Sequence, residues 1–459
     1  MTASSIHPGD LEPSRVKLRT YITRRRILRF DAAMVLGLMF TLLTVIPARL
    51  ILPGTTDIGR PALVVALGMF CWWVIARMSP GLTLTGPQPI RWALVAWWFS
   101  LLLSYAVGFQ RGYTGMEANS ADRWLLGMAA FSGVVLGLSD GLSNWDRLRT
   151  FLKAMVWASA FMSLVGLAEA ALSQPLSGYL VLPGLEEIRA APELQVRGGS
   201  LRVASTTSHY IELSAVLATA LPFAIHLARF GPTKEERRRY LIAAVLIGAG
   251  IPATISRTGI VAIGISMACL VPLWTWRMRY NVLVMCAGVF GALGAVKPSF
   301  AMTIVEMFTN ISEDPSITSR TEDYELVGYY FAQRPWLGRG TGSWVVPQYI
   351  YLDNQWLSTA LCQGLLGCAL LAGLFLTAMV LAIIALRRAT SAEDKHLCAA
   401  LIGTQIIAMF VSATFDSLWF DTYAITMAVT IGLCGAVWRF THPRRAVRTS
   451  IPDRFLRDG

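Results

Sequence analysis

The sequence predicts an all-α polytopic membrane protein with about twelve transmembrane helices and a large, partly helical outer loop between helices 9 and 10. Of the 459 residues, 54% are hydrophobic and only 15% are charged, and the mean hydropathy is +0.52. A soluble protein of this length carries about 25% charge. Apolar runs of roughly 18 residues or more, each long enough to cross a bilayer as a helix, recur from Phe30 to Phe440.

These apolar runs set the expected organisation of the chain. A basic tail over 1–29 precedes helices 1–9, which fill 30–298 and include an outer loop near 173–206. A large extracytoplasmic loop covers 299–354, helices 10–12 occupy 355–439, and a second basic tail covers 440–459. The expected spans are 30–51, 62–78, 91–108, 124–139, 150–172, 207–229, 240–255, 258–276, 281–298, 355–386, 397–415 and 422–439.

The basic residues predict the orientation. Most of the 40 Lys and Arg residues lie in the two tails and in the loops on the same side of the membrane as the tails. Because basic residues accumulate on the cytoplasmic side, we expect a multi-pass protein with both termini in the cytoplasm. The net charge of +12 is therefore assigned to membrane orientation and not to nucleic-acid binding. The seven cysteines all lie in apolar runs without metal spacing, which argues against a disulfide framework.

The large loop over 299–354 is too long to be a simple connection. It is rich in aromatic residues and has no low-complexity repeats, so its composition is not that of a disordered segment. The stretch "SRTEDYELVGYYFAQ", residues 319–333, predicts an amphipathic helix entered through a Ser or Thr cap. We expect this loop to form a folded cap on the outer face.

Three arginines of the outer loops are candidate anion ligands. Arg257 lies in "TISRTGIVAIG", where two apolar runs nearly touch, and it could hold a diphosphate or extend to lipid headgroups. Arg320 begins the amphipathic helix and could bind a polyanion or pair with Asp323. Arg339 lies in "RPWLGRGTGSW", whose glycines lack the context of a nucleotide-binding loop and indicate tight turns that pass close to a neighbouring backbone.

A second polar edge is expected at the start of the sixth span, in "LRVASTTSHYIELS". It supplies Arg202, His209 and Glu212 as candidates for substrate binding. His209 and Glu212 are three residues apart, which predicts a hydrogen-bonded pair lining an outer cavity. Further ligands at helical spacing are not evident, so no metal site is expected. Glu212 lies about one turn inside the membrane, where acidic residues are functional by default.

Asp353 is the remaining candidate, in "YLDNQWL" at the start of the tenth span. None of the five histidines lies in the large loop, so a general base there must be a carboxylate, and Asp353 is the last one before the membrane. An aspartate at this position also suits a helix N-cap. Local sequence leaves both interpretations open, and Asn354 and Gln355 follow as possible sugar ligands.

The order of these motifs resembles the O-antigen ligase, O-antigen polymerase and exopolysaccharide polymerase superfamily of polytopic envelope glycosyltransferases. The motifs "SRTG", "SR", "RPWLGRGTGSW" and "LDNQWLSTALCQGLLG" lie between about Leu201 and Gly367. The resemblance implies a metal-independent enzyme without a cofactor in the plasma (inner) membrane. It would transfer or polymerise glycan from a polyprenyl-diphosphate-linked donor to a glycan or lipid acceptor hydroxyl on the outer face, with other envelope polysaccharide assembly proteins as candidate partners.

The resemblance also implies roles for residues. Arg257 and Arg320 would neutralise the diphosphate, and Asp353 stands where ligases usually carry histidine. Aspartate has an ordinary pKa near 3.9 and is a weak base at neutral pH unless its site raises the pKa. The "HYIE" segment and the Asp353-Asn354 pair favour a polymerase-like member over a lipopolysaccharide ligase. The alternatives are a flippase of lipid-linked glycans, which predicts charged groups at mid-membrane depth, and a non-catalytic member of an assembly complex.

Overall fold

The computed structural model of the chain describes residues 31–78, 86–188, 195–197, 200–296, 302–303, 305–306, 309 and 315–443. The side chains of residues 315–323 are not among those described. The basic tail predicted over 1–29, and the part of the second tail beyond residue 443, lie outside the described residues.

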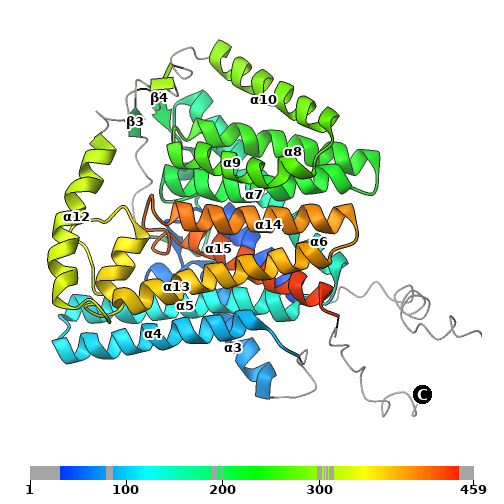
Figure 1. Cartoon of the computed structure of the whole chain (residues 1–459). Helices are drawn as coiled ribbons and strands as arrows, with labels where there is room; N and C mark the ends of the chain where they lie inside the picture. The colour runs from blue at the N-terminus through cyan, green and yellow to red at the C-terminus, as the bar shows by residue number, and fades with distance from the viewer. Residues whose placement is uncertain are drawn as a thin grey trace, which may run out of the picture.

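The described chain is a bundle of long helices that run side by side (Figure 1). Each of the expected spans coincides with one helix, and α12 (Pro315–Gln333) lies in the large loop, over the stretch predicted to be helical. The bundle helices are α2 (Ala32–Val45), α3 (Pro61–Met78), α4 (Pro89–Arg111), α5 (Gly115–Gly141), α6 (Trp145–Leu172), α7 (Tyr210–Phe230), α8 (Lys234–Ala253), α9 (Arg257–Leu270), α10 (Trp276–Val296), α13 (Gln355–Arg388), α14 (Ala392–Val411) and α15 (Asp421–Thr441).

The length and composition of these helices are those of a multi-pass membrane protein. In the described part of the chain, eight helices are long and apolar enough to cross a membrane. Two shorter apolar helices are α2 and the stretch Arg257–Leu273, in which the 3-10 turn η4 (Val271–Leu273) continues α9. Helices α8 and α10 are long but are not among the eight. The number of twelve spans therefore stays a prediction.

Local chemistry moves several helix ends away from the predicted positions. Helix α2 ends at Val45 and does not continue to residue 51, because Pro47 follows one residue after its C-cap. Helix α8 begins at Lys234 and not at residue 240. The hydroxyl of Thr233 accepts a hydrogen bond from the Glu236 N–H at 3.1 Å, which caps this earlier start.

The loop between α2 and α3 and the loop between α6 and α7 contain short antiparallel strand pairs. Strand β1 (Leu50–Ile51) pairs with β2 (Glu186–Glu187), with Leu50 opposite Glu187. Strand β3 (Gln195–Arg197) pairs with β4 (Ser200–Arg202), with Val196 opposite Leu201. Strands β2, β3 and β4 all lie in the described parts of the loop predicted near 173–206.

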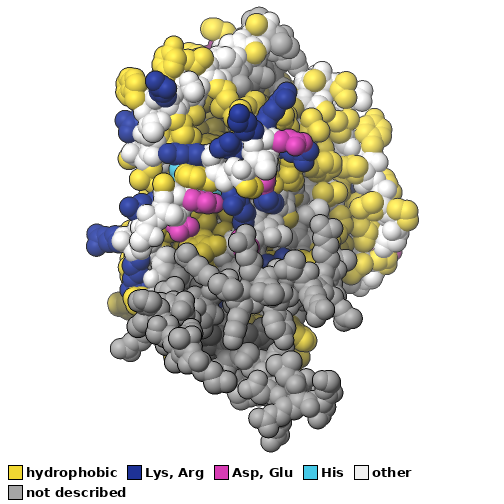
Figure 2. All heavy atoms as spheres, turned by 90° about the vertical axis from the view of Figure 1, so that its right-hand side faces the viewer, with side chains coloured by type: hydrophobic (Ala, Val, Ile, Leu, Met, Phe, Trp, Pro, Cys, Tyr) yellow, Lys and Arg dark blue, Asp and Glu magenta, His cyan; other side chains and the backbone are white. Residues whose placement is uncertain are grey.

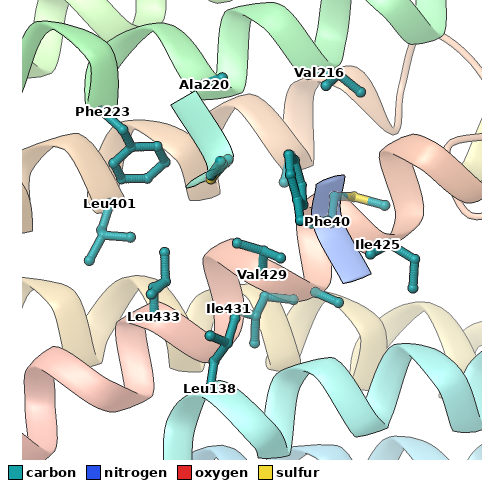
Figure 3. Packing of buried hydrophobic residues seen from close by; sticks show 14 of the residues in the cluster. Phe40, Leu138, Val216, Ala220, Phe223, Leu401, Ile425, Val429, Ile431 and Leu433 are labelled. Atoms are coloured by element: carbon teal, nitrogen blue, oxygen red, sulfur yellow. The ribbon is translucent and has the colours of Figure 1, made fainter. Parts of the chain in front are cut away.

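The apolar core surrounds α15, whose membrane-length window is 94% buried. Ile425, Val429 and Leu433 of α15 lie among side chains from the neighbouring helices in Figure 3. Phe223 of α7 and Leu401 of α14 contribute to the same packing. Because α15 is enclosed by protein on all sides, its two ends are held firmly, and the loop that precedes it has a fixed place.

Helix α13 is broken at Gly364, where φ is 68° and ψ is −166°. The glycine-rich segment of the large loop passes against this break. The N–H groups of Arg339 and Gly340 donate to the carbonyls of Leu361 and Cys362 at 2.8 and 3.0 Å, so the loop completes hydrogen bonds that the helix leaves open. A Cβ on Gly338 would lie 2.4 Å from the backbone of Cys362. The prediction of tight turns in close backbone contact is confirmed.

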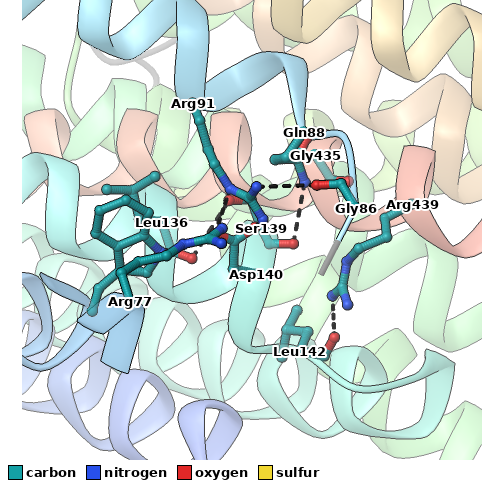
Figure 4. Close-up of polar contacts among 11 residues, drawn as sticks. Arg77, Gly86, Gln88, Arg91, Leu136, Ser139, Asp140, Leu142, Gly435 and Arg439 are labelled. Carbon is teal, nitrogen blue, oxygen red and sulfur yellow. Dashed lines mark hydrogen bonds and ion pairs between the residues drawn. The ribbon is translucent and has the colours of Figure 1, made fainter. Parts of the chain in front are cut away.

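One end of the bundle carries a charged surface, seen in Figure 2, where Lys and Arg side chains gather with a few acids. Asp140 accepts two hydrogen bonds from Arg91, both at 2.8 Å, and a further one from Arg77 at 3.3 Å (Figure 4). Arg149 forms an ion pair with Glu393 at 3.2 Å at the same end. These arginines belong to the set predicted to be cytoplasmic. We call the opposite end, which carries α12 and the first residues of α7, α9, α13 and α15, the cap end.

Candidate functional site

The first residues of α13 separate the two interpretations of Asp353. The N-cap of this helix is Asn354, whose Oδ1 accepts hydrogen bonds from the N–H groups of Trp356 and Leu357 at 2.9 and 3.3 Å. The interpretation of Asp353 as the cap is therefore wrong. Asp353 is exposed, and within the described part of the chain its carboxylate has no hydrogen-bond or ion-pair partner.

Gln355 is the side chain that fixes this segment in place. It is 1% exposed, its Oε1 accepts from the Leu418 N–H at 2.7 Å, and its Nε2 donates to the Thr359 hydroxyl at 3.0 Å. Its backbone N–H donates to the carbonyl oxygens of Ser412 and Phe415. Gln355 thus joins the start of α13 to the loop between α14 and α15, and its amide does not face the surface as a sugar ligand would.

The loop joined in this way brings a second carboxyl group to the start of α13. Asp416 is half-buried, and its Oδ1 has no contact with solvent and no hydrogen-bond partner. Burial raises the pKa of Asp416 to about 7, a hydrogen bond with the Ser358 hydroxyl opposes this rise, and the negative charge of Asp353 adds to it. The two aspartates therefore act on each other electrostatically at the cap end.

Arg202 and His209 lie on the other side of the same loop. The ring of Phe420, in this loop, lies 5.9 Å from the ring of His209 and 5.3 Å from the ring of Phe415. Burial and the charge of Arg202 lower the pKa of His209 to about 4, so its imidazole is neutral at pH 7. The His209 Nδ1 accepts from the Ile211 N–H at 3.3 Å, which leaves Nε2 as the protonated donor.

Arg202 connects this group to the turn before Arg257. Its guanidinium donates to the Ile255 carbonyl at 3.1 Å and lies over the Tyr210 ring, with Cζ 3.2 Å from the centroid. Ile255 is buried and has φ of 49°, which is a strained conformation for a β-branched residue. Arg257 follows two residues later as the first residue of α9 and is half-buried. The structure therefore brings Arg202, His209 and the Arg257 turn together.

Glu212 has a different environment from Asp353. It is fully buried, and its carboxylate accepts hydrogen bonds from the N–H groups of Ser208, Thr422 and Tyr423 at 2.9, 2.8 and 3.2 Å. It therefore stabilises the N-terminus of α15 from the neighbouring helix. The hydrogen-bonded pair predicted between His209 and Glu212 is wrong, because each side chain accepts from backbone N–H groups instead.

Arg339 attaches the large loop to the corner between α4 and α5. Its Nη2 donates to the Tyr349 hydroxyl at 2.8 Å, and that hydroxyl donates to Glu117 at 3.2 Å. Glu117 is fully buried and also pairs with Arg111 at 2.7 Å. Arg339 further lies over the Tyr330 ring. These contacts fix the loop above α13 and use the side chain of Arg339 within the protein.

The remaining predictions concern the side chain of Arg320, the cap of α12 and metal binding. Arg320 lies within α12, but its side chain is not among those described, so its choice between Asp323 and a ligand stays a prediction. The predicted Ser or Thr cap of this helix is wrong, because α12 begins earlier, at Pro315. Among the described residues, no three His, Cys, Asp or Glu side chains are grouped so that they could hold a metal ion.

Part of the chain, including several residues of the cap end, matches a known protein family. Residues 242–372 match the family model described as O-Antigen ligase, Wzy_C. Over these residues the chain is similar to the O-antigen ligase domain. Comparison with curated proteins found no match.

The O-antigen ligase domain runs from within α8 to within α13. It includes Arg257, Arg339 and the Asp353–Gln355 segment, and it supports the resemblance to the O-antigen ligase superfamily. Arg202, His209 and Asp416 lie outside the matched residues, on elements that contact the domain through the Arg257 turn and through Gln355.

Asp416 is the residue that sequence reasoning missed. The base was predicted within the large loop, whereas Asp416 lies in a separate short loop, 63 residues after Asp353. Its signal in the sequence is weak: one acid in "SATFDSLWF", between two apolar runs at the predicted outer side. The hydrogen bonds of Gln355, and that of Asp416 with Ser358, show that this loop lies against the start of α13.

Proposed function

We propose that this protein is a metal-independent membrane glycosyltransferase of the O-antigen ligase and polymerase type. It takes glycan from a polyprenyl-diphosphate-linked donor and transfers it to an acceptor hydroxyl on the outer face of the plasma (inner) membrane. In this proposal the chain crosses the membrane twelve times with both termini in the cytoplasm, and the cap end faces outward. The product belongs to the cell envelope or to an exopolysaccharide.

The observation that carries this proposal is the carboxylate of Asp353, which is exposed and has no hydrogen-bond or ion-pair partner among the described residues. Asn354 caps α13 and Gln355 anchors it, so neither function of this helix start depends on Asp353. An exposed carboxylate without a structural task is available to an incoming acceptor. We assign it the role of activating or orienting the acceptor hydroxyl.

Arg257 and Arg320 supply the positive charge for the donor. As the acceptor oxygen attacks the anomeric carbon, the bond from that carbon to the diphosphate oxygen breaks and its electron pair stays on the diphosphate. Guanidinium groups bind phosphate oxygens in pairs, and they stabilise the charge that grows on the leaving group. Arg202 and His209 are assigned to the same substrate, because Arg202 contacts the turn before Arg257 and the neutral His209 offers an N–H donor beside it.

The same residues favour a polymerase-like reaction over ligation to a lipopolysaccharide core. The chain has Asp353 where ligases usually carry a histidine, and the "HYIE" segment at the start of α7 accompanies it. We therefore propose that the acceptor is a growing glycan and that the product is a longer chain.

Deletion of the gene in its native strain tests the proposed function. We expect long polymer to disappear and short lipid-linked units to accumulate, and we expect the wild-type gene to restore the polymer. The Arg257→Ala variant should fail to restore it. Arg334→Ala is the matched control, because Arg334 is an exposed arginine of the large loop to which we assign no contact with donor or acceptor.

Two results would contradict the proposal. An unchanged glycan profile in the deletion strain would show that the protein does not build this polymer. Proteoliposomes in which the purified protein moves lipid-linked glycan across the bilayer without changing its length would show a flippase instead.

A further inference from the structure

The loop between α14 and α15, residues 412–420, is held against the start of α13 by hydrogen bonds from one residue. Gln355 donates its backbone N–H to the Ser412 and Phe415 carbonyls and accepts from the Leu418 N–H at 2.7 Å. The hydroxyls of Ser412 and Ser417 are 2.8 Å apart and close the loop on itself. Asp416 lies in the middle of this loop and is placed as firmly as the backbone around it.

The carboxyl group of Asp416 gains little from this placement. Its Oδ1 is out of contact with solvent and has no hydrogen-bond partner among the described residues. A buried polar atom without a partner costs stability, and most such atoms in folded proteins are paired. The groups that act on this carboxyl group are Ser358, Asp353 and Cys362, all from the first turns of α13 or just before them. None of the three is a cation that would compensate its charge.

We propose that Asp416 is the general base of the transfer reaction and that Asp353 orients the acceptor hydroxyl. This assignment rests on the function proposed above. The acceptor O–H transfers its proton to the Asp416 carboxylate while its oxygen forms the new bond to the anomeric carbon. The bond between that carbon and the diphosphate breaks at the same time, and its electron pair leaves with the diphosphate.

The chemistry favours Asp416 over Asp353 for the proton. A general base works best when its pKa is near the operating pH. Burial brings the pKa of Asp416 to about 7, so Asp416 at neutral pH is both partly ionised and a far stronger base than an ordinary carboxylate. The nearby negative charge of Asp353 makes the Asp416 carboxylate more basic. The Asp353 carboxylate also orients the acceptor hydroxyl toward Asp416. The pair would thus supply a base at the cap end, where the large loop has no histidine.

The test measures initial rates of glycan elongation by the purified protein between pH 5.5 and 8.5 in about half-unit steps. For the wild type, the rate should fall about tenfold per pH unit below about pH 7. Asp416→Asn should lower the rate at least about 100-fold across this range. Asp353→Asn should lower the rate and shift the acidic limb to lower pH, because the charge that raises the pKa of Asp416 is gone.

Thermal unfolding separates a base from a structural residue. The ionised Asp416 is disfavoured in the folded protein, so Asp416→Asn should leave the melting temperature unchanged or raise it at pH 8. Asp122→Asn is the matched control: Asp122 is exposed near the same end, accepts from the Tyr105 hydroxyl at 2.5 Å, and should keep the wild-type rate and pH profile.

Each outcome decides one of the two claims. An active wild type together with an Asp416→Asn variant of wild-type rate and pH profile would overturn the role of Asp416 and leave the proposed function standing. An Asp416→Asn variant that loses its rate together with several degrees of melting temperature would make Asp416 structural. A folded wild type that elongates no lipid-linked glycan would instead overturn the proposed function.

Discussion

The starts of α7 and α13 offer a direct comparison, because each places an acidic residue at a helix start at the cap end. At α7 the acid, Glu212, is fully buried and binds three backbone N–H groups, two of them at the start of α15. At α13 the amides do this work: Asn354 caps the helix and Gln355 anchors the neighbouring loop. Asp353 is exposed and has no partner within the described part of the chain.

The two helix starts separate acids at a membrane edge that are held by the fold from acids that stay available for chemistry. A helix start has several N–H groups without partners inside the helix, and some acceptor must satisfy them. A carboxylate that accepts hydrogen bonds from these N–H groups is held in place, and the positive end of the helix dipole stabilises its negative charge. Where an amide takes that role, the neighbouring carboxylate stays free. The predictions below test this division, and they run from the largest expected effect on stability to the smallest.

The largest loss is expected for Glu212→Ala. Three backbone N–H groups would be left buried without an acceptor, so the free energy of unfolding should fall by roughly 3–5 kcal/mol. Thermal unfolding in detergent measures this, with Glu212→Gln as the milder companion. A variant that unfolds like the wild type but no longer makes polymer would mean that Glu212 serves the substrate and not the fold.

The break in α13 predicts a comparable loss for Gly364→Ala. Gly364 has φ of 68°, and a Cβ there would lie 2.3 Å from the backbone of Trp336. The strain and the displaced loop together should cost about 2–4 kcal/mol. Gly373→Ala, where a Cβ meets nothing within 4 Å, is the control in the same helix. Equal melting temperatures for the two variants would show that the loop does not pack against the break.

Substitution of Asn354 should lower stability, whereas substitution of Asp353 should lower the elongation rate. Asn354→Ala removes the cap and should lower the free energy of unfolding by about 1 kcal/mol. Asp353→Asn should change it by less than about 0.5 kcal/mol, because the carboxylate is exposed and has no described partner to lose, yet it should reduce elongation severely. The measurements are thermal unfolding and elongation rate on both variants. If Asp353→Asn proved the less stable of the two, the assignment of the cap to Asn354 would fail.

The sequence predicted the helices well because an apolar run of membrane length pairs its backbone groups internally by forming a helix. Every expected span falls on a helix. Helix ends were missed where a single side chain decides them, as Thr233 does for α8. The resemblance to the family and the choice of Arg202, His209 and Arg257 as candidates also came from the sequence, whereas their clustering comes from the structure. The partners of Glu212 and the approach of Asp416 were not, because both depend on how α15 and its loop pack against helices far away in the chain.

The most direct test of the account uses the purified wild-type protein in liposomes that carry a polyprenyl-diphosphate-linked glycan. The distribution of glycan lengths is measured by mass spectrometry before and after incubation. We predict longer lipid-linked glycans and release of the polyprenyl diphosphate, with neither product from Arg257→Ala. Glycans that keep their length in the presence of folded wild-type protein would contradict the central claim that the cap end transfers glycan.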